Sequence, residues 1–223
     1  MFQLTQEQIH HYEIQGYLLV SGLIPDEIAA NAEAAMWREL HASLEDRSSW
    51  GNAPNGTRIF ENADLLACFT PDFIASAARL AGDDPTTFAQ PTRALVLNVF
   101  PTESEWKWPG AHIDHAIKEH GHKTFPRAFR IASMTFLNDV APHGGGTIVW
   151  PGSHKKIARL AKSDSSRYEM MWTLNQELDK ADIGSPVELT PKRGDVLLYH
   201  SLCAHSGSQN TSDRPRFALN QKW

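Results

Sequence analysis

Two residues of metal-binding type, His112 and Asp114, stand two positions apart in the middle of the chain. Alternate side chains of an extended strand point to the same face, so an imidazole and a carboxylate at this spacing project together. Two histidines and one carboxylate form the facial triad that holds Fe(II) in non-haem oxygenases and leaves coordination positions open. The spacing therefore predicts two of three metal ligands. Because short motifs recur by chance, a surface histidine beside an exposed carboxylate is the alternative interpretation.

The third ligand is expected at His205, shortly after the apolar run 195–199. Histidine and carboxylate ligands suit Fe(II), but also zinc or manganese, so the ligand set does not name the metal. Arg216 stands eleven residues beyond His205 and begins the last β-rich run. A guanidinium on a strand beside a metal site can clamp a carboxylate through two hydrogen bonds, whereas a surface ion pair is its ordinary alternative. Arg214 precedes a proline in a turn and is expected to be solvated.

These residues need a scaffold that brings the segments around residues 112 and 205 together. Residues 1–90 are predicted to be a mostly helical layer, because capping signals and apolar periodicity precede glycine and proline breaks. Helices are expected over residues 5–16, 25–44, 64–69 and 71–80, with a short strand at 17–20 and a loop at 45–58.

Short β-rich runs dominate the rest of the chain and are separated by Gly, Pro and Asn turns, as in sandwiches and barrels. They cover residues 94–100, 131–137, 147–150, 186–189, 195–199 and 216–219. The sequence therefore predicts a mainly β fold, in which the helical layer covers a double-stranded β-helix (jelly-roll, cupin-like) core over residues 91–223. One helical insert is expected at about 155–180, and residues 1–223 are expected to form a single domain.

Composition excludes several classes of function. The net charge of −5 gives no basic excess with which to neutralise nucleic-acid phosphates. No apolar run approaches the roughly 18 residues that would span a membrane, and the N-terminus carries no signal-peptide pattern. Cys68 and Cys203 suggest reduced thiols rather than a disulfide framework. We therefore expect a soluble, cytoplasmic protein whose partner is a small molecule, not a nucleic acid or a membrane.

The ordered motifs resemble the phytanoyl-CoA dioxygenase-like branch of the Fe(II)/2-oxoglutarate-dependent oxygenases. The resemblance covers nearly the whole chain, and the ordered set is far more specific than any one motif. The motifs are Gly16-Tyr17, Trp108-Pro109-Gly110-Ala111-His112-Ile113-Asp114, Leu137-Asn138-Asp139, residues 144–154, residues 194–198, His205 and the segment at Arg216.

The resemblance implies a role for each matching residue. His112, Asp114 and His205 match the iron ligands, and Arg216 matches the arginine that binds the distal carboxylate of 2-oxoglutarate. The implied reaction hydroxylates a small molecule with O₂ while 2-oxoglutarate is decarboxylated to succinate and CO₂. Chlorinating relatives lack the ligand carboxylate, so Asp114 favours hydroxylation. Asn98 matches a position where related enzymes often place a polar cosubstrate contact, with an ordinary turn-side or core amide as the alternative. Thr147 and Ser133 are weaker candidates for the same wall, and ordinary strand residues are the favoured interpretation of both.

Two features leave alternatives open. The loop 115–130 carries His115, His120, His122 and several basic residues. It is either an ordinary solvated loop, a cationic rim for an anionic substrate, or a second metal cluster. The function also has alternatives: a jelly-roll protein that binds a metal or ligand without turnover, or a zinc-dependent hydrolase, in which Arg216 would have no obvious task.

Overall fold

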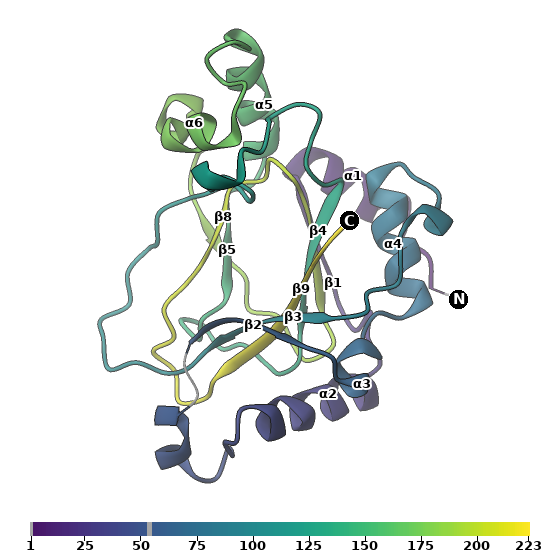
Figure 1. Ribbon diagram of the computed structural model, residues 1–223, viewed down its shortest axis with the longest axis vertical. Coiled ribbons are helices and arrows are strands. Elements are labelled where there is room, and N and C mark those ends of the chain that lie inside the picture. Colours follow the sequence, from purple (N-terminus) through teal and green to yellow (C-terminus); the bar gives the residue numbers. More distant parts are fainter. Residues whose placement is uncertain (1, 53–54) are drawn as a thin grey trace.

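The computed structural model describes residues 2–52 and 55–223, and its core is two antiparallel β-sheets that face each other (Figure 1). The larger sheet has six strands in the order β1-β7-β4-β9-β3-β2, and the smaller has three in the order β6-β5-β8. The predicted mainly β, jelly-roll fold with a helical layer is confirmed. The strands are β1 (Tyr17–Val20), β2 (Gly56–Phe60), β3 (Ala94–Val99), β4 (Ile131–Phe136), β5 (Thr147–Val149), β6 (Val187–Glu188), β7 (Val196–His200), β8 (His205–Gly207) and β9 (Arg216–Lys222).

Most of the N-terminal helices lie beside the large sheet, whereas α5 and α6 gather at one end of the molecule (Figure 1). The α-helices are α1 (Gln6–Gln15), α2 (Asp26–Glu39), α3 (Ala63–Leu66), α4 (Pro71–Ala81), α5 (Ser153–Ser163) and α6 (Met171–Gln176). Four 3₁₀ helices, η1 (Arg47–Asn52), η2 (Pro85–Thr87), η3 (Lys118–His120) and η4 (Leu178–Ala181), complete the described helical segments. In the described part of the chain, no helix combines the length and apolar character needed to cross a membrane.

Local capping explains where the N-terminal helices start and end. Thr5 and Gln8 form a reciprocal capping box at the start of α1, and Gly16 ends it in a left-handed conformation. Thr70 caps α4 before Pro71, and Gly82 ends that helix in the same way. These signals were legible in the sequence, so the positions of α1 and α4 agree with the prediction.

The central strands of the large sheet are buried on both faces. On one face, Ile131, Val196 and Phe217 join the cluster that includes Phe73 of α4. On the other face, Met134, Leu197, Tyr199 and Ala218 pack in the space between the two sheets. Because side chains alternate along a strand, each residue's position in that alternation decides whether it meets the helices or the interior.

Several segments differ from the prediction, including α3, which ends at Leu66 rather than residue 69, and β8, which was not among the predicted strands. The expected loop 45–58 contains η1 and the start of β2, and residues 53 and 54 of it lie outside the described residues. β2 is an exposed edge strand without apolar alternation, so its pairing with β3 rather than its pattern defines it. α2 stops at Glu39 rather than near residue 44, because His41 has a φ of 50°, which no α-helix accommodates. The insert is divided into α5 and α6 instead of one helix.

Candidate metal centre

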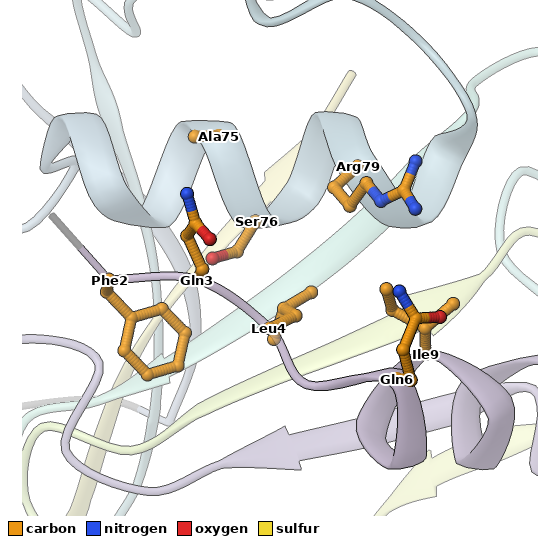
Figure 2. Close-up of a pocket in the computed structure, with 8 residues that line it drawn as sticks. All are labelled: Phe2, Gln3, Leu4, Gln6, Ile9, Ala75, Ser76 and Arg79. Carbon is orange, nitrogen blue, oxygen red and sulfur yellow. The ribbon is translucent and has the colours of Figure 1, made fainter.

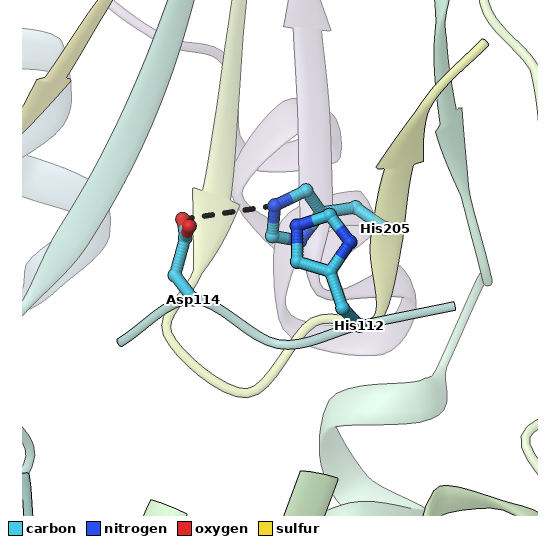
Figure 3. Close-up of side chains that lie close together, drawn as sticks. All are labelled: His112, Asp114 and His205. Atoms are coloured by element: carbon cyan, nitrogen blue, oxygen red, sulfur yellow. Dashed lines mark ion pairs between the residues drawn. The ribbon is translucent and has the colours of Figure 1, made fainter. Parts of the chain in front are cut away.

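The backbone of the motif at residues 112–114 is paired with β8. The His112 N–H donates to the His205 carbonyl at 3.0 Å, and the His205 N–H donates to the His112 carbonyl at 2.9 Å. This bridge brings His112, Asp114 and His205 together, with one possible ligand atom from each lying within 4.8 Å of the others (Figure 3). Two segments about ninety positions apart in sequence therefore supply one candidate metal site.

The residue between the two ligands fixes their direction. Ile113 is 1% exposed and packs in the apolar cluster under the insert, on the side away from the triad. Its backbone N–H donates to Oδ1 of Asn175 in α6 at 2.8 Å. With Ile113 held this way, His112 and Asp114 both turn towards His205, as the two-residue spacing requires.

Hydrogen bonding and burial prepare both imidazoles for metal binding. Nδ1 of His205 lies 2.9 Å from the Cys203 carbonyl, which can only accept, so this nitrogen carries the hydrogen. In the neutral ring, Nε2 then offers its lone pair, and it lies 3.6 Å from Oδ2 of Asp114. Burial, followed by the neighbouring His205, lowers the pKa of His112 to about 4. His112 is therefore neutral at pH 7, the form in which imidazole binds a metal.

Asp114 is held as an anion by its neighbours. The Tyr199 hydroxyl donates to Oδ2 at 3.0 Å, and Nζ of Lys222 lies 3.1 Å from Oδ1. Burial works to raise the pKa of Asp114, but His205 and Lys222 outweigh it and the net shift is downward. Burial, and then Asp114, raises the pKa of Tyr199 well above its usual range, so this phenol stays a donor.

The triad opens into a pocket of about 260 Å³. Its walls come from both sheets and combine the candidate ligands with apolar and polar side chains. The lining residues are Thr57, Leu95, Leu97, His112, Asp114, Met134, Thr147, Tyr199, His205, Ser206, Gly207, Arg216, Asn220 and Lys222.

Arg216 is the buried cation of this pocket. It is 3% exposed, and its Nε and Nη1 donate to the carbonyls of Gly145 and Leu97 at 2.9 and 2.8 Å. Gly145 has a φ of 80°, and a Cβ there would press on Val99 at 3.2 Å, so glycine suits this approach. Burial lowers the pKa of Arg216 to about 10, which leaves it charged at pH 7.

No carboxylate among residues 2–52 and 55–223 forms an ion pair with Arg216, although burying an unpaired charge is costly. An anionic ligand in the pocket would supply the missing countercharge. Two imidazoles, one carboxylate and a buried guanidinium together fit a divalent metal and a cosubstrate that carries carboxylates.

The remaining sequence candidates lie on different faces of their strands, and this decides which of them reach the pocket. Thr147 lines the pocket, and its contact with a cosubstrate stays a prediction. Asn98 and Ser133 do not line the pocket, and the structure corrects both predictions. Asn98 lies on the same face of β3 as the buried Ala94 and Val96, whereas Leu95 and Leu97 line the pocket.

Ser133 lies on the side of β4 that carries Ile131, which packs with the helical layer. Its hydroxyl donates to the Gln221 carbonyl at 3.4 Å, while the neighbouring Met134 lines the pocket. A shift of one position along a strand moves a side chain to the other face, which is why neither Asn98 nor Ser133 reaches the site.

Sequence reasoning missed several residues of the pocket, among them Tyr199, Asn220 and Lys222, whose polar groups lie close to the triad or to each other. The signal was present for β9, because side chains at even steps from Arg216 share its face and so include Asn220 and Lys222. The three histidines of the loop 115–130, His115, His120 and His122, do not form a second metal cluster. The triad is the only group of three possible metal-binding side chains in the described part of the chain.

A larger hollow, of about 360 Å³, lies between the N-terminal segment and α4 (Figure 2). Its walls carry one titratable side chain, that of Arg79, and none of the imidazoles or carboxylates that bind metals. Size alone therefore does not locate the chemistry, and the smaller pocket at the triad is the candidate active site. The hollow is lined by Phe2, Gln3, Leu4, Gln6, Ile9, Ala75, Ser76 and Arg79.

Comparisons with known proteins agree with this geometry. A family model described as phytanoyl-CoA dioxygenase matches residues 12–218. No curated protein matches the chain. Among solved structures, the non-haem α-ketoglutarate-dependent carbocyclase SnoK from nogalamycin biosynthesis is 19% identical with a TM-score of 0.65, over 97% of this chain and 82% of that one.

Two further solved structures are similar. EctD from S. alaskensis, solved with 2-oxoglutarate and 5-hydroxyectoine, is 19% identical with a TM-score of 0.64, over 97% of this chain and 74% of its own. EvdO2 from Micromonospora carbonacea var. aurantiaca, solved with 2-oxoglutarate, is 15% identical with a TM-score of 0.66, over 98% and 90% of the two chains. At these identities the similarity establishes a shared fold.

Proposed function

The chain belongs to the phytanoyl-CoA dioxygenase family, and from that premise we propose that it is an Fe(II)/2-oxoglutarate-dependent oxygenase that hydroxylates a small molecule. In this reaction O₂ is consumed and 2-oxoglutarate is converted to succinate and CO₂. The observation that carries the proposal is the convergence of His112, Asp114 and His205, with Arg216 in the same pocket. The structures of EctD and EvdO2 with 2-oxoglutarate support the choice of cosubstrate.

In this assignment, His112, Asp114 and His205 hold Fe(II) from one side. When bound, the iron and its cosubstrate supply the oxidation chemistry. The protein supplies orientation: Cys203 sets the tautomer of His205, and Tyr199 holds the carboxylate of Asp114. Losing such an outer contact typically lowers metal affinity or activity by about 10- to 100-fold.

Arg216 would receive the distal carboxylate of 2-oxoglutarate at the closed end of the pocket. Its Nε and Nη1 are already directed by backbone carbonyls, so the guanidinium is positioned before any ligand arrives. Thr147 stands in the same wall and can add a hydrogen bond. Leu97 and Met134 form apolar walls that limit water around the reacting groups.

Hydroxylation is the proposed outcome because Asp114 occupies the third ligand position and leaves no place there for a halide. SnoK, with the same fold, is named as a carbocyclase. Incorporation of oxygen from ¹⁸O₂ into the product therefore distinguishes hydroxylation from ring closure. A non-catalytic binding protein would release no succinate with any substrate, and a zinc hydrolase would act without O₂.

The decisive experiment is an anaerobic titration of the protein with Fe(II) and 2-oxoglutarate. We expect the metal-to-ligand charge-transfer band of a chelated 2-oxo acid to appear in the visible spectrum. In buffer free of halide, which could otherwise take the place of the carboxylate, Asp114→Ala should lose stoichiometric iron and the band together, because the variant lacks one of three protein ligands. Asp139→Ala, which removes an exposed carboxylate that pairs with Lys192, is the matched control and should keep both. Absence of the band from the unaltered protein, or stoichiometric iron in Asp114→Ala, would refute the assignment.

A further inference from the structure

Strand β9 presents two cations to one pocket. Arg216 and Lys222 are an even number of positions apart, so their side chains share a face, and both line the pocket. Six positions along a strand span roughly 20 Å, so the backbone positions of Arg216 and Lys222 are well separated. Arg216 is deeply buried at the closed end, whereas the side chain of Lys222 is 24% exposed. The pocket therefore has a cation at its floor and another towards its opening.

The backbone around Lys222 is firmly held. Lys222 pairs with Ala132 of β4, and Trp223 beyond it exchanges backbone hydrogen bonds with Ile131. The Trp223 ring turns to the opposite face and packs against Phe73 and Phe88, with ring centroids 5.6 and 5.5 Å away. This anchor leaves the Lys222 side chain directed into the pocket.

Lys222 pairs with Asp114, which is also one of the three candidate metal ligands. Its Nζ lies 3.1 Å from Oδ1 of Asp114. On the proposed function, on which this inference rests, the site holds neutral histidines, one carboxylate, a divalent metal and a dianionic cosubstrate. Those charges, with Arg216 and Lys222, leave one positive charge without a counterion. A substrate with a single negative charge would complete the balance.

We propose that Lys222 binds a carboxylate of the substrate and that the enzyme acts on carboxylic acids. An ammonium group is a strong point-charge donor for such an anion. A phosphate ester carries about 1.5 to 2 negative charges at pH 7 and would overshoot the balance. The Phe129 ring, whose centroid lies 5.8 Å from Nζ of Lys222, adds an apolar surface beside the anchoring point. The acid would thus place its carbon skeleton near the metal with its carboxylate towards the opening.

Benzoate and its neutral analogue benzamide, which match in shape, test this inference without a known substrate. The protein is loaded with Mn(II), saturated with 2-oxoglutarate and freed of excess metal. Paramagnetic relaxation of the probe protons then reports binding beside the metal. We expect benzoate to bind about tenfold more tightly than benzamide, as one charge-assisted hydrogen bond allows. The preference should disappear in Lys222→Met and persist in Lys222→Arg.

Lys123→Met is the matched control. Lys123 lies on the loop 115–130, its side chain is 59% exposed, and it pairs with Glu169. It should keep the preference for benzoate. Equal binding of both probes by the unaltered protein, or a preference that survives in Lys222→Met, overturns the inference. Loss of Mn(II) from Lys222→Met also overturns it, because Lys222 would then serve to hold Asp114.

Calorimetry of 2-oxoglutarate binding to the Mn(II) protein separates the two levels of the argument. If 2-oxoglutarate does not bind, the proposed function fails. If it binds and benzoate shows no advantage over benzamide, this inference alone fails.

Discussion

The cationic side chains at the two ends of β9 contact different kinds of group. Arg216 is enclosed, and its guanidinium donates to the backbone carbonyls of Gly145 and Leu97. Lys222 is partly exposed, and its contacts are side chains: the Asp114 carboxylate and the Phe129 ring. Backbone acceptors stay in place when side chains change, whereas side-chain partners differ with every substitution. The comparison teaches that the closed end is suited to an invariant ligand and the opening to a ligand particular to this protein.

The largest effect is expected when the cation at the closed end of the pocket is removed. Arg216→Leu removes the cation proposed to bind 2-oxoglutarate, so affinity for the cosubstrate should fall by about a hundredfold, the equivalent of about 3 kcal/mol. Iron binding should persist, because no ligand of the triad changes. Calorimetric titration of 2-oxoglutarate into the metal-loaded protein measures the affinity for the cosubstrate, and titration of the metal into the metal-free protein measures metal binding.

Arg214→Leu is the control for Arg216→Leu, since Arg214 pairs with Glu33 instead of facing the pocket. Arg216→Lys should give an intermediate loss, because it keeps the charge without the planar fork of donors. Unchanged 2-oxoglutarate affinity in Arg216→Leu would show that the closed end does not hold the cosubstrate.

A smaller effect concerns the insert that covers the triad. Asn175→Ala removes the acceptor of the Ile113 N–H, between the two ligands. Metal affinity should fall by about tenfold, the lower end of what outer contacts contribute. Competition with a metal chelator measures the change.

Asn175→Asp keeps an oxygen acceptor and should restore the affinity that Asn175→Ala loses. Gln176→Ala, at the exposed neighbouring position of α6, serves as the control. If Asn175→Ala binds metal as well as the unaltered protein, α6 does not position the ligands and the insert belongs only to the opening.

The prediction with the least effect on metal or cosubstrate binding concerns stability in acid, at the end of the sheet where His200 and Lys222 lie. Burial, and then Arg127, lowers the pKa of His200 to about 3. At pH 7 the ring is uncharged in the folded chain and mostly uncharged in the unfolded chain. Below the unfolded pKa of about 6.5, the unfolded chain takes up a proton that the folded chain refuses, so stability falls as the pH drops towards 3.

His200→Asn should therefore reduce the difference in unfolding free energy between pH 7 and pH 4.5 by about 2 kcal/mol, measured by urea denaturation. His112, whose pKa is about 4, would keep part of the acid sensitivity. The exposed His10→Asn should leave the difference unchanged. An identical pH dependence in His200→Asn would mean that His200 does not become charged on unfolding.

The triad could be predicted because two of its metal-binding residue types stand close together in the sequence at a recognisable spacing. His112 and Asp114 stand two positions apart, a spacing that predicts side chains on one face, and the residue order up to Arg216 supplied the rest. The fold class followed from the short β-rich runs, and α1 and α4 from their caps. That the three triad residues bind metal, and that Arg216 binds 2-oxoglutarate, remain predictions.

Asn98 and Ser133 could not be placed from sequence for a physical reason. For Ser133, every residue of β4 is buried, so its pattern carries no alternation that tells the interior face from the helical face. For Asn98, apolar residues occupy both faces of β3, because Leu95 and Leu97 line the pocket while Ala94 and Val96 pack towards the helices. β2 was missed for the opposite reason, because an exposed edge strand shows no apolar face at all. In both cases the neighbouring strands carry the missing information.

The backbone bridge between His112 and His205 consists of two hydrogen bonds, and it joins two parts of the chain that are distant in sequence. A metal ion bound by both residues would act as a clasp across that junction. Binding to the folded state alone stabilises it by an amount that grows with metal concentration. Iron supply would then set how long this protein survives local opening and proteolysis, as well as whether it can turn over.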